Sequence, residues 1–258
     1  EEHARITKEA IQQSELKMAR TLQLGMLPER CPEIPGFVLA ARSLPASDVG
    51  GDFYDFLQMH DHQVGIAVGD VSGHGITGAM IVGMARTSIR FASTEESGPA
   101  RVLSIANERL RQDITKNIFV AMFYGILDPE EHLIRYICAG QPTPILVREG
   151  KAEFIPHGRG DRFPLGILSG VHYSEERLTM TPGDTLVFYT DGIVEAMNAE
   201  KEEFGFERLK EFLARCATLQ PDVIIDTLLN ELERFGGTEE QNDDITIVVL
   251  QYRNRRQL

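Results

Sequence analysis

The sequence has little of what stabilises small secreted or membrane-spanning proteins. It has no tryptophan and three cysteines, Cys31, Cys138 and Cys216, which lie far apart without CxxC spacing. Disulfides and a zinc site are therefore not expected, and a reducing compartment fits best. No apolar run approaches the length that crosses a bilayer, and no signal-peptide pattern is present. These absences predict a cytoplasmic protein without a membrane span in this chain.

Basic residues are also scarce. The chain has 26 Lys and Arg against 39 Asp and Glu, a formal net charge of −13. No basic stripe is available to displace counterions from phosphates, which argues against nucleic-acid binding. The 258 residues are 42% hydrophobic and 25% charged, as in ordinary globular proteins, and are enough for a sizeable core.

The first 27 residues favour a helix. They are rich in Glu, Lys, Gln, Ala and Leu, and Ala4, Ile11, Met18 and Leu22 recur at near-heptad intervals. Two interpretations are open, a surface helix of the domain and a short coiled coil that would form a homodimer. The chain begins with Glu1 rather than Met, as a fragment of a longer protein would.

Prolines at 28, 32 and 35 predict an extended linker over residues 28–36, followed by one domain over residues 37–253. Alternating patterns predict strands at 37–44, 52–59, 63–71, 118–128, 132–138, 144–148, 152–155, 171–180, 184–189 and 245–252. The strands at 171–180 and 184–189 are expected to form a hairpin. Helices are expected at 74–91, after Gly98, and at 206–217 and 221–234. Hairpins followed by paired helices predict an α+β sandwich of antiparallel sheets covered by helices.

Aspartates recur at strand ends or beside glycine turns. They are Asp52, Asp70, Asp191 and the pair Asp243 and Asp244. Any single Asp before Gly is ordinary turn chemistry. Apolar strands lead into Asp70 and Asp191, however, and a buried carboxylate is unfavourable unless it is paired or binds a metal. Together the aspartates favour a metal site.

Oxygen ligands without a His/Cys cluster are typical of Mg²⁺ or Mn²⁺. Four carboxylates carry four negative charges, which two divalent ions would neutralise. Metal pairs of this kind, about 3.5–4 Å apart, activate a water and hold a phosphoryl group. The residues therefore indicate phosphate-ester hydrolysis.

A competing motif is present at residues 73–78, GHGITG, which matches the GxGxxG dinucleotide fingerprint. Glu95 and Glu96 lie about 20 residues further on, where that fingerprint expects an acid. The flanking pattern is a hairpin rather than a βαβ unit. A dinucleotide-dependent oxidoreductase therefore ranks below the metal interpretation, and these glycines are also compatible with close helix packing.

Several motifs together resemble the PPM (type 2C-like) protein phosphatases of the bacterial SpoIIE/RsbU-like branch. They occur in family order as VGGDFYD at 49–55, GDVSGHG at 69–75, FYTDGIVEA at 188–196 and DDIT at 243–246. The resemblance covers residues 16–252. It implies an α-β-β-α sandwich in which Asp70 bridges two metal ions and the Val71 carbonyl binds one.

The resemblance also implies that Asp52, Asp191 and Asp243 are ligands, with Asp244 as the alternative to Asp243. Tyr54, Asp55 and Glu195 are expected to be structural. Type 2C enzymes outside this branch carry a histidine two residues after the bridging aspartate, where Ser72 stands here. His74 is a candidate general acid and equally a residue that orients the turn.

Two further departures from the family pattern concern phosphate binding and a turn. The phosphate-binding arginine has no clear counterpart, and Arg42 is the nearest candidate. Gln141 stands where branch members often carry histidine and is expected to be structural.

The resemblance implies hydrolysis of phosphoserine or phosphothreonine on a protein by a water activated between two Mn²⁺ or Mg²⁺ ions. It further implies a STAS-type anti-anti-sigma substrate in bacterial partner switching. An upstream sensor or receiver module would act through the helix at 1–27. The alternative from another class is a catalytically silent phosphatase fold that serves as a binding module.

Overall fold

The protein is described here from a computed structural model. The description covers residues 2–73, 75–115, 117–157, 160, 162–239 and 241–253. Residues 2–12 and 61 are described by their backbone alone. No helix in these ranges combines the length and the apolar character needed to span a membrane.

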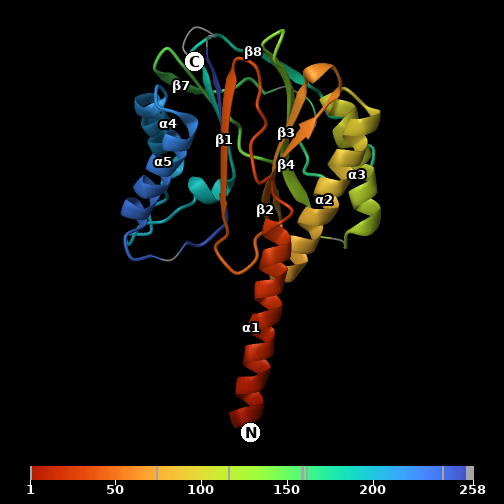
Figure 1. The fold of residues 1–258 in the computed structure, drawn as a ribbon, viewed down its shortest axis with the longest axis vertical. Coiled ribbons are helices and arrows are strands. Elements are labelled where there is room, and N and C mark those ends of the chain that lie inside the picture. Colours follow the sequence, from red (N-terminus) through yellow and green to blue (C-terminus); the bar gives the residue numbers. More distant parts are fainter. Residues whose placement is uncertain are drawn as a thin grey trace.

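The domain is a four-layer sandwich, as Figure 1 shows. Two five-stranded sheets stack face to face, with α4 (Gly205–Cys216) and α5 (Pro221–Gly236) over one and α2 (Gly75–Glu95) and α3 (Pro99–Asp113) over the other. This α-β-β-α arrangement confirms the expected fold class.

One sheet, called sheet A here, carries the termini of the domain. Its strands run in the order β1 (Phe37–Leu44), β10 (Ile245–Tyr252), β9 (Thr185–Tyr189), β6 (Ile145–Arg148) and β7 (Lys151–Phe154). Strand β10 is buried along its whole length, which explains its unbroken apolar run.

The other sheet, sheet B, has the strand order β2 (Asp52–Gln58), β3 (Val64–Val71), β4 (Val120–Asp128), β5 (Leu133–Ala139) and β8 (Glu176–Thr179). It contains the hairpins β2–β3 and β4–β5, with β8 at one edge. The turn between β2 and β3 is a short 3-10 helix, η1 (His60–His62), between the strands predicted at 52–59 and 63–71.

Three apolar layers hold the sandwich together, one between the sheets and one under each helix pair. The middle layer includes Phe123 and Phe188 from opposite sheets, whose ring centroids lie 4.6 Å apart. Burying one such ring contributes about 1.5–3 kcal/mol. The middle layer thereby sets how the two sheets face each other.

One predicted hairpin is wrong. The expected partners at 171–180 and 184–189 lie in different sheets, because β8 pairs with β5 whereas β9 pairs with β10 and β6. The turn at Thr181, Pro182 and Gly183 therefore crosses between the layers. Turn residues indicate that the chain reverses direction, but they do not indicate which sheet the next strand joins. Long-range burial determines that.

The dinucleotide interpretation is not supported by the topology. Each pairing between the named strands is antiparallel, and β3 is followed by two helices before β4 returns beside it. A dinucleotide fingerprint requires a parallel βαβ unit. Gly78 instead allows close packing, since a Cβ there would lie 3.1 Å from the carbonyl carbon of Gly73.

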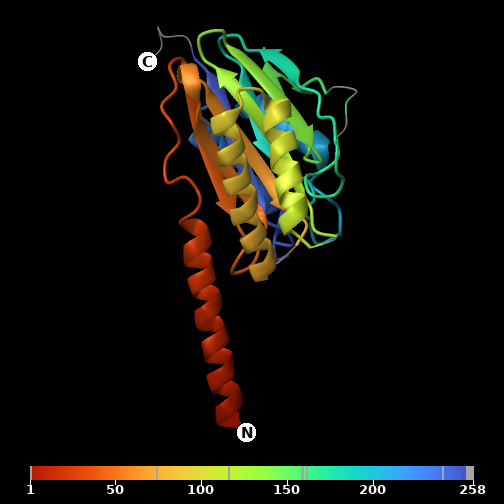
Figure 2. The same cartoon turned by 90° about the vertical axis from the view of Figure 1, so that its right-hand side faces the viewer.

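The N-terminal helix α1 (Glu2–Leu24) projects from one end of the sandwich (Figures 1 and 2). Only its last turns reach the domain, where it contacts α2. Met18 and Leu22, two of the apolar positions predicted at near-heptad spacing, are 66% and 63% exposed and so remain uncovered in a single chain.

Candidate metal centre

The candidate aspartates lie at one edge of the sandwich. In sheet B, Asp52 at the start of β2 pairs directly with Asp70 near the end of β3. In sheet A, Asp191 follows the end of β9 and Asp243 precedes β10, two strands that are antiparallel neighbours. Carboxylates separated by up to 191 residues in the chain are therefore delivered to one place by strand ends.

The first two aspartates face the opposite sheet. Alternate residues of a strand share a face, and Tyr54 and Val68, two positions from Asp52 and Asp70, belong to the layer between the sheets. Asp52 is only 5% exposed. A buried carboxylate in this position requires hydrogen bonds or a cation.

Thr190 joins the two sheets at this edge. Its Oγ1 donates to Asp52 Oδ2 over 2.7 Å and accepts the backbone N–H of Thr246 over 2.9 Å. Thr190 is fully buried. It therefore holds one oxygen of Asp52 between β9 and β10.

Asp244 has a different role from its neighbour. Its carboxylate accepts backbone N–H groups from Ala46 (2.7 Å) and Gly51 (2.6 Å), and more weakly from Asp52 (3.4 Å). Both oxygens are thereby used to hold the loop before β2. A side chain at Gly50 would collide with this carboxylate, which explains the glycine. Between the two alternatives, this leaves Asp243 better placed as a ligand.

The carboxylates influence one another strongly. Burial, followed by the charges of Asp191, Asp243 and Asp244, raises the pKa of Asp70 to about 7. Burial, followed by the charge of Asp70, raises the pKa of Asp52 well above its usual value. Because such influence falls with distance, these shifts place the carboxylates within one electrostatic site.

Two further acidic side chains share this negative field. Removal from water raises the pKa of Asp243, followed by the charges of Asp191 and Asp244. The pKa of Glu195, which the sequence predicted to be structural, is raised by desolvation and then by Asp191 and Asp243. Glu195 thus adds to the negative field.

Backbone oxygens complete a cradle beside Asp70. A Cβ atom at Gly51 would lie 2.8 Å from the Val71 carbonyl oxygen, 3.1 Å from that of Gly73 and 3.2 Å from Asp70 Oδ1. Three oxygens therefore converge on the space that the absent Cβ leaves. An oxygen-only donor set fits Mg²⁺ or Mn²⁺, so the residues fit the expected ions.

The carboxylates are neighbours without forming a closed ligand shell. Within the described ranges, no group of three or more His, Cys, Asp or Glu side chains is arranged to hold a metal ion. Asp243 Oδ1 accepts the N–H of Asp244 over 2.8 Å, so part of this carboxylate is already committed. Closing a shell around a cation requires side-chain rotation between staggered rotamers.

The predicted residue Arg42 does not join the aspartates. Arg42 pairs with Asp226 of α5 over 2.9 Å. Its alternate neighbours Ala40 and Leu44 pack under α4 and α5, so Arg42 faces the helices rather than the space between the sheets. The structure therefore does not support Arg42 as a phosphate ligand. His74 lies outside the described residues.

Ser72, which stands in the place of the type 2C histidine, has a structural role. Its Oγ accepts the N–H of Phe119 over 2.8 Å, and its own N–H donates to the Phe119 carbonyl over 3.0 Å. These bonds pin the segment after β3 to the start of β4.

Sequence reasoning missed Gln23. This residue of α1 is 8% exposed, and its amide donates to the Gly50 carbonyl and accepts the Gly50 N–H over 3.0 Å. The side chain thus binds both backbone groups of the residue two positions before Asp52. Nothing in the local sequence, where Gln23 lies between Leu22 and Leu24, distinguishes it from a surface glutamine.

Gln141 is placed close to Asp70. Its Nε2 donates to the carbonyl of Ala121 over 3.2 Å, and Ala121 pairs with Asp70 across β4 and β3. Within the described residues, its Oε1 is the one buried side-chain nitrogen or oxygen without a hydrogen-bond partner. Such an orphaned acceptor at the edge of the site suits a polar ligand or water.

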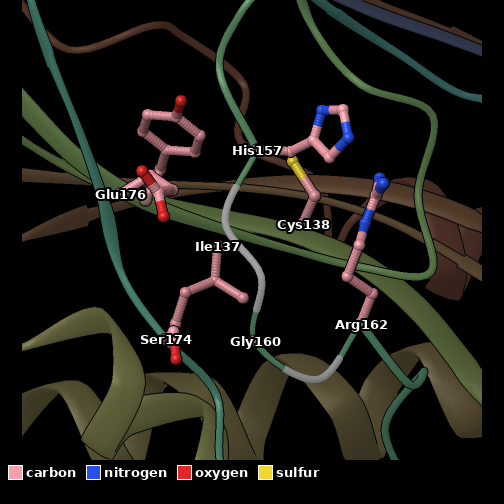
Figure 3. Close-up of a pocket in the computed structure, with 8 residues that line it drawn as sticks. Ile137, Cys138, His157, Gly160, Arg162, Ser174 and Glu176 are labelled. Carbon is pink, nitrogen blue, oxygen red and sulfur yellow. The ribbon is translucent and has the colours of Figure 1, made fainter.

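Apart from the aspartate site, a small pocket combines residue types found in cysteine-dependent phosphatases. Figure 3 shows Cys138 of β5 between His157 and Arg162, with Ser174 and Glu176 opposite. The cavity has a volume of about 20 Å³, which suits a single water. Burial raises the pKa of the Cys138 thiol to about 12, so it stays protonated and is a poor nucleophile. This pocket does not compete with the aspartate site.

Comparisons with known proteins agree with this geometry. Protein IcfG of Synechocystis sp. is 29% identical over 280 residues, which cover 97% of this chain and 43% of IcfG. The phosphoserine phosphatase RsbU of Bacillus subtilis is 28% identical over 92% of this chain and 70% of RsbU. The chain thus spans less than half of one of these relatives and about two thirds of the other.

The fold has a close counterpart among solved structures. The SiaA-PP2C domain of Pseudomonas aeruginosa superposes with a TM-score of 0.83 at 22% identity, covering 98% of this chain and 100% of that domain. Residues 60–253, most of the chain, match the family model of stage II sporulation protein E, SpoIIE. The chain belongs to the SpoIIE family of PPM-type phosphatases.

Proposed function

We propose that the chain is a metal-dependent protein serine/threonine phosphatase whose site is the aspartate edge between the sheets. The observation that carries the proposal is the convergence of carboxylates from both sheets around Asp70, whose pKa is raised to about 7 by burial and then by the charges of Asp191, Asp243 and Asp244. Carboxylates gathered in this way, without a basic partner among the described residues, suit divalent cations.

Two Mn²⁺ or Mg²⁺ ions fit this arrangement. Asp70 would be shared by both ions, with the Val71 carbonyl, Asp52, Asp191 and Asp243 as the further ligands. Once bound, the ions would activate a water and offset charge on the phosphoryl oxygens. No covalent enzyme intermediate is needed.

The chain's own residues prepare this edge. Thr190 keeps Asp52 oriented between the sheets, and Asp244 holds the loop that precedes Asp52. The Gly51 backbone leaves room beside Asp70 and Val71. His74 stays a predicted proton donor to the leaving group.

The first test is hydrolysis of p-nitrophenyl phosphate with Mn²⁺, then with chelator, by the wild type and by Asp70→Asn. We expect activity that the chelator abolishes and the substitution removes. Asp226→Asn is the matched control, since Asp226 is an exposed acid that pairs with Arg42. Full Mn²⁺-dependent activity of Asp70→Asn would defeat the proposal.

The same assay separates the alternative from another class. A silent phosphatase fold that acts as a binding module would bind a phosphoprotein without hydrolysing it under any metal condition. Retention of every predicted aspartate, in a geometry that brings them together, favours the enzyme.

For the physiological substrate we propose a phosphorylated STAS-type anti-anti-sigma protein. The support is similarity to RsbU, which is a phosphoserine phosphatase. Release of phosphate from a serine-phosphorylated STAS protein, with an unrelated phosphoserine protein as the control, tests this. Equal rates on both proteins would contradict it.

We further propose that α1 transmits regulation to the site, from an upstream sensor or receiver module if the chain is part of a longer protein. The support is the Gln23 amide bound to both backbone groups of Gly50, and the exposed apolar side chains of Met18 and Leu22. Joining two copies along α1 would cover those side chains and would act on Gly50 through one rigid helix.

Gln23→Ala tests the link to the site, and Met18→Glu with Leu22→Glu tests pairing of two copies. We expect weaker Mn²⁺ binding in the first variant and a shift toward monomer by analytical ultracentrifugation in the second. Unchanged Mn²⁺ affinity in Gln23→Ala and an unchanged sedimentation coefficient would remove this part of the proposal.

A further inference from the structure

A groove of about 460 Å³ runs from the candidate metal centre along α5. It lies between the segment after β9, the C-terminal half of α5 and the segment that leads into β10. Gly192 and Asp243 are among the residues that line it. The groove therefore adjoins the aspartate edge, because Asp243 belongs to both.

The groove has an apolar floor. Leu44, Met197, Leu229, Leu232 and Ile245 line it, and the last two are 6% and 7% exposed. These side chains belong to the layer under α4 and α5 or to its margin. An occupant with an apolar side chain would remove part of this floor from water.

The rim of the groove is acidic. Glu195, Glu233, Glu239 and Asp243 line it, and no Lys, Arg or His is among the described residues that do so. Glu239 already pairs with Lys201 over 2.6 Å. Besides the predicted metal ligand Asp243, Glu195 after β9 and Glu233 on α5 remain as exposed carboxylates that line the groove.

Position and charge together indicate the occupant. An extended chain advances about 3.3 Å per residue, so side chains within two to four residues of a phosphoserine reach about 7–13 Å from it. Phosphoserine brings negative charge, which the acidic rim would repel unless a neighbouring cation offsets it. A Lys or Arg, with an apolar stem and a charged end, suits an apolar floor and an acidic rim.

We propose that this groove binds the segment that flanks the phosphorylated residue of the protein substrate and selects a Lys or Arg there. The inference rests on the proposed phosphatase function and deepens it, because it names a specificity determinant of the same site. Glu233 on α5 is the residue expected to meet the substrate's cation.

The test compares two phosphoserine peptides that differ at one position, with Lys or Glu three residues from the phosphoserine. We expect the wild type to favour the Lys peptide by about tenfold in kcat/KM, mainly through KM, since an attraction replaces a repulsion. Glu233→Lys is expected to abolish or reverse the preference. Glu211→Lys, a charge reversal on α4 away from the groove, is expected to keep it.

p-Nitrophenyl phosphate separates the groove from the chemistry, because it has no flanking segment. Its kcat/KM is expected to change less than about twofold in Glu233→Lys. Equal rates of the wild type on both peptides, or an unchanged preference in Glu233→Lys, overturns the groove proposal and leaves the phosphatase function standing. If the wild type does not hydrolyse p-nitrophenyl phosphate, the proposed phosphatase function is contradicted instead.

Binding provides a measurement that does not depend on turnover. Fluorescence anisotropy of the two labelled peptides with Asp70→Asn is expected to show the same preference for Lys, and the added Glu233→Lys is expected to remove it. Equal affinity of Asp70→Asn for both peptides would overturn the proposal even if catalysis were absent.

Discussion

Asp52 and Asp55 lie three residues apart on β2, yet the fold treats their carboxylates in opposite ways. Asp55 is 2% exposed and accepts hydrogen bonds from Arg90 over 2.6 and 2.7 Å and from Arg86 over 3.2 Å. Asp52 is 5% exposed and has threonine side chains, Thr190 and Thr246, as its hydrogen-bond partners. The protein supplies cations for one carboxylate and none for the other.

The comparison extends to the other aspartates. Asp184 is buried and pairs with Arg148 over 2.6 Å. Within the described ranges, no ion pair joins Asp52, Asp70, Asp191 or Asp243 to a basic side chain. Buried acids with protein cations tie layers together, whereas the acids at the edge are suited to cations from solution. The following predictions test that distinction.

The largest effect is expected on catalysis from Asp70→Asn. Because we propose Asp70 as a ligand shared by two ions, its loss is expected to lower kcat/KM for p-nitrophenyl phosphate by more than about 100-fold, since changes outside the ligand shell already have effects of 10–100-fold. Unfolding by urea is expected to show retained stability, because a repelling charge has been removed. A lower free energy of unfolding in Asp70→Asn would instead indicate that Asp70 stabilises the fold, as Asp55 and Asp184 do.

Asp55→Asn is expected to act on stability rather than chemistry. The substitution leaves Arg86, whose side chain is 11% exposed, without its charged partner, at a loss of about 3 kcal/mol in the free energy of unfolding. Urea denaturation measures this loss. kcat per folded molecule is expected to stay within about twofold of the wild type, and a collapse of kcat in a folded variant would break the comparison.

A smaller effect is expected from pH in the presence of chelator. The Asp70 carboxyl has a pKa of about 7 in the folded protein against an ordinary value of 3.8. The folded state therefore holds a proton that the unfolded state loses, and stability falls as pH rises between these values. The slope is at most about 1.4 kcal/mol per pH unit from this group.

Urea denaturation from pH 5 to 7.5 measures that slope. Asp70→Asn is expected to flatten it, and saturating Mn²⁺ is expected to reverse it, since ions bind the deprotonated carboxylates. A slope that is the same in the wild type and the variant would assign the pH dependence to other groups.

The smallest effect is expected from Arg42→Gln. The pair with Asp226 is half exposed on both sides, so its loss is expected to change the free energy of unfolding by less than about 0.5 kcal/mol. KM for p-nitrophenyl phosphate is expected to stay unchanged. A large rise in KM would restore Arg42 as a phosphate ligand.

Much of the fold could be predicted from local patterns. Strands β3 and β10 have apolar runs, and the strands of the hairpins β2–β3, β4–β5 and β6–β7 overlap the ranges predicted from the sequence. The sequence did not predict that β8 and β9 belong to different sheets. Two strands with a turn between them have the same local pattern whether they pair with each other or join two sheets.

The candidate metal centre could also be predicted only in part. Asp70 and Asp191 were indicated by the apolar strands that lead to them, and glycine turns marked their surroundings. Gln23, Thr190 and the backbone contacts of Asp244 had no sequence signal, because each acts on a residue more than 25 positions away. Local pattern cannot report such contacts.

By itself, the sequence determined that aspartates stand at the ends of strands, since hydrophobic periodicity and turn chemistry are local properties. Only the tertiary structure decided which buried aspartate meets an arginine and which meets other aspartates. Asp52 and Asp55 differ in this respect because successive side chains on a strand alternate between faces, one toward the opposite sheet and one toward α2. The long-range packing of the layers determines what each face contacts.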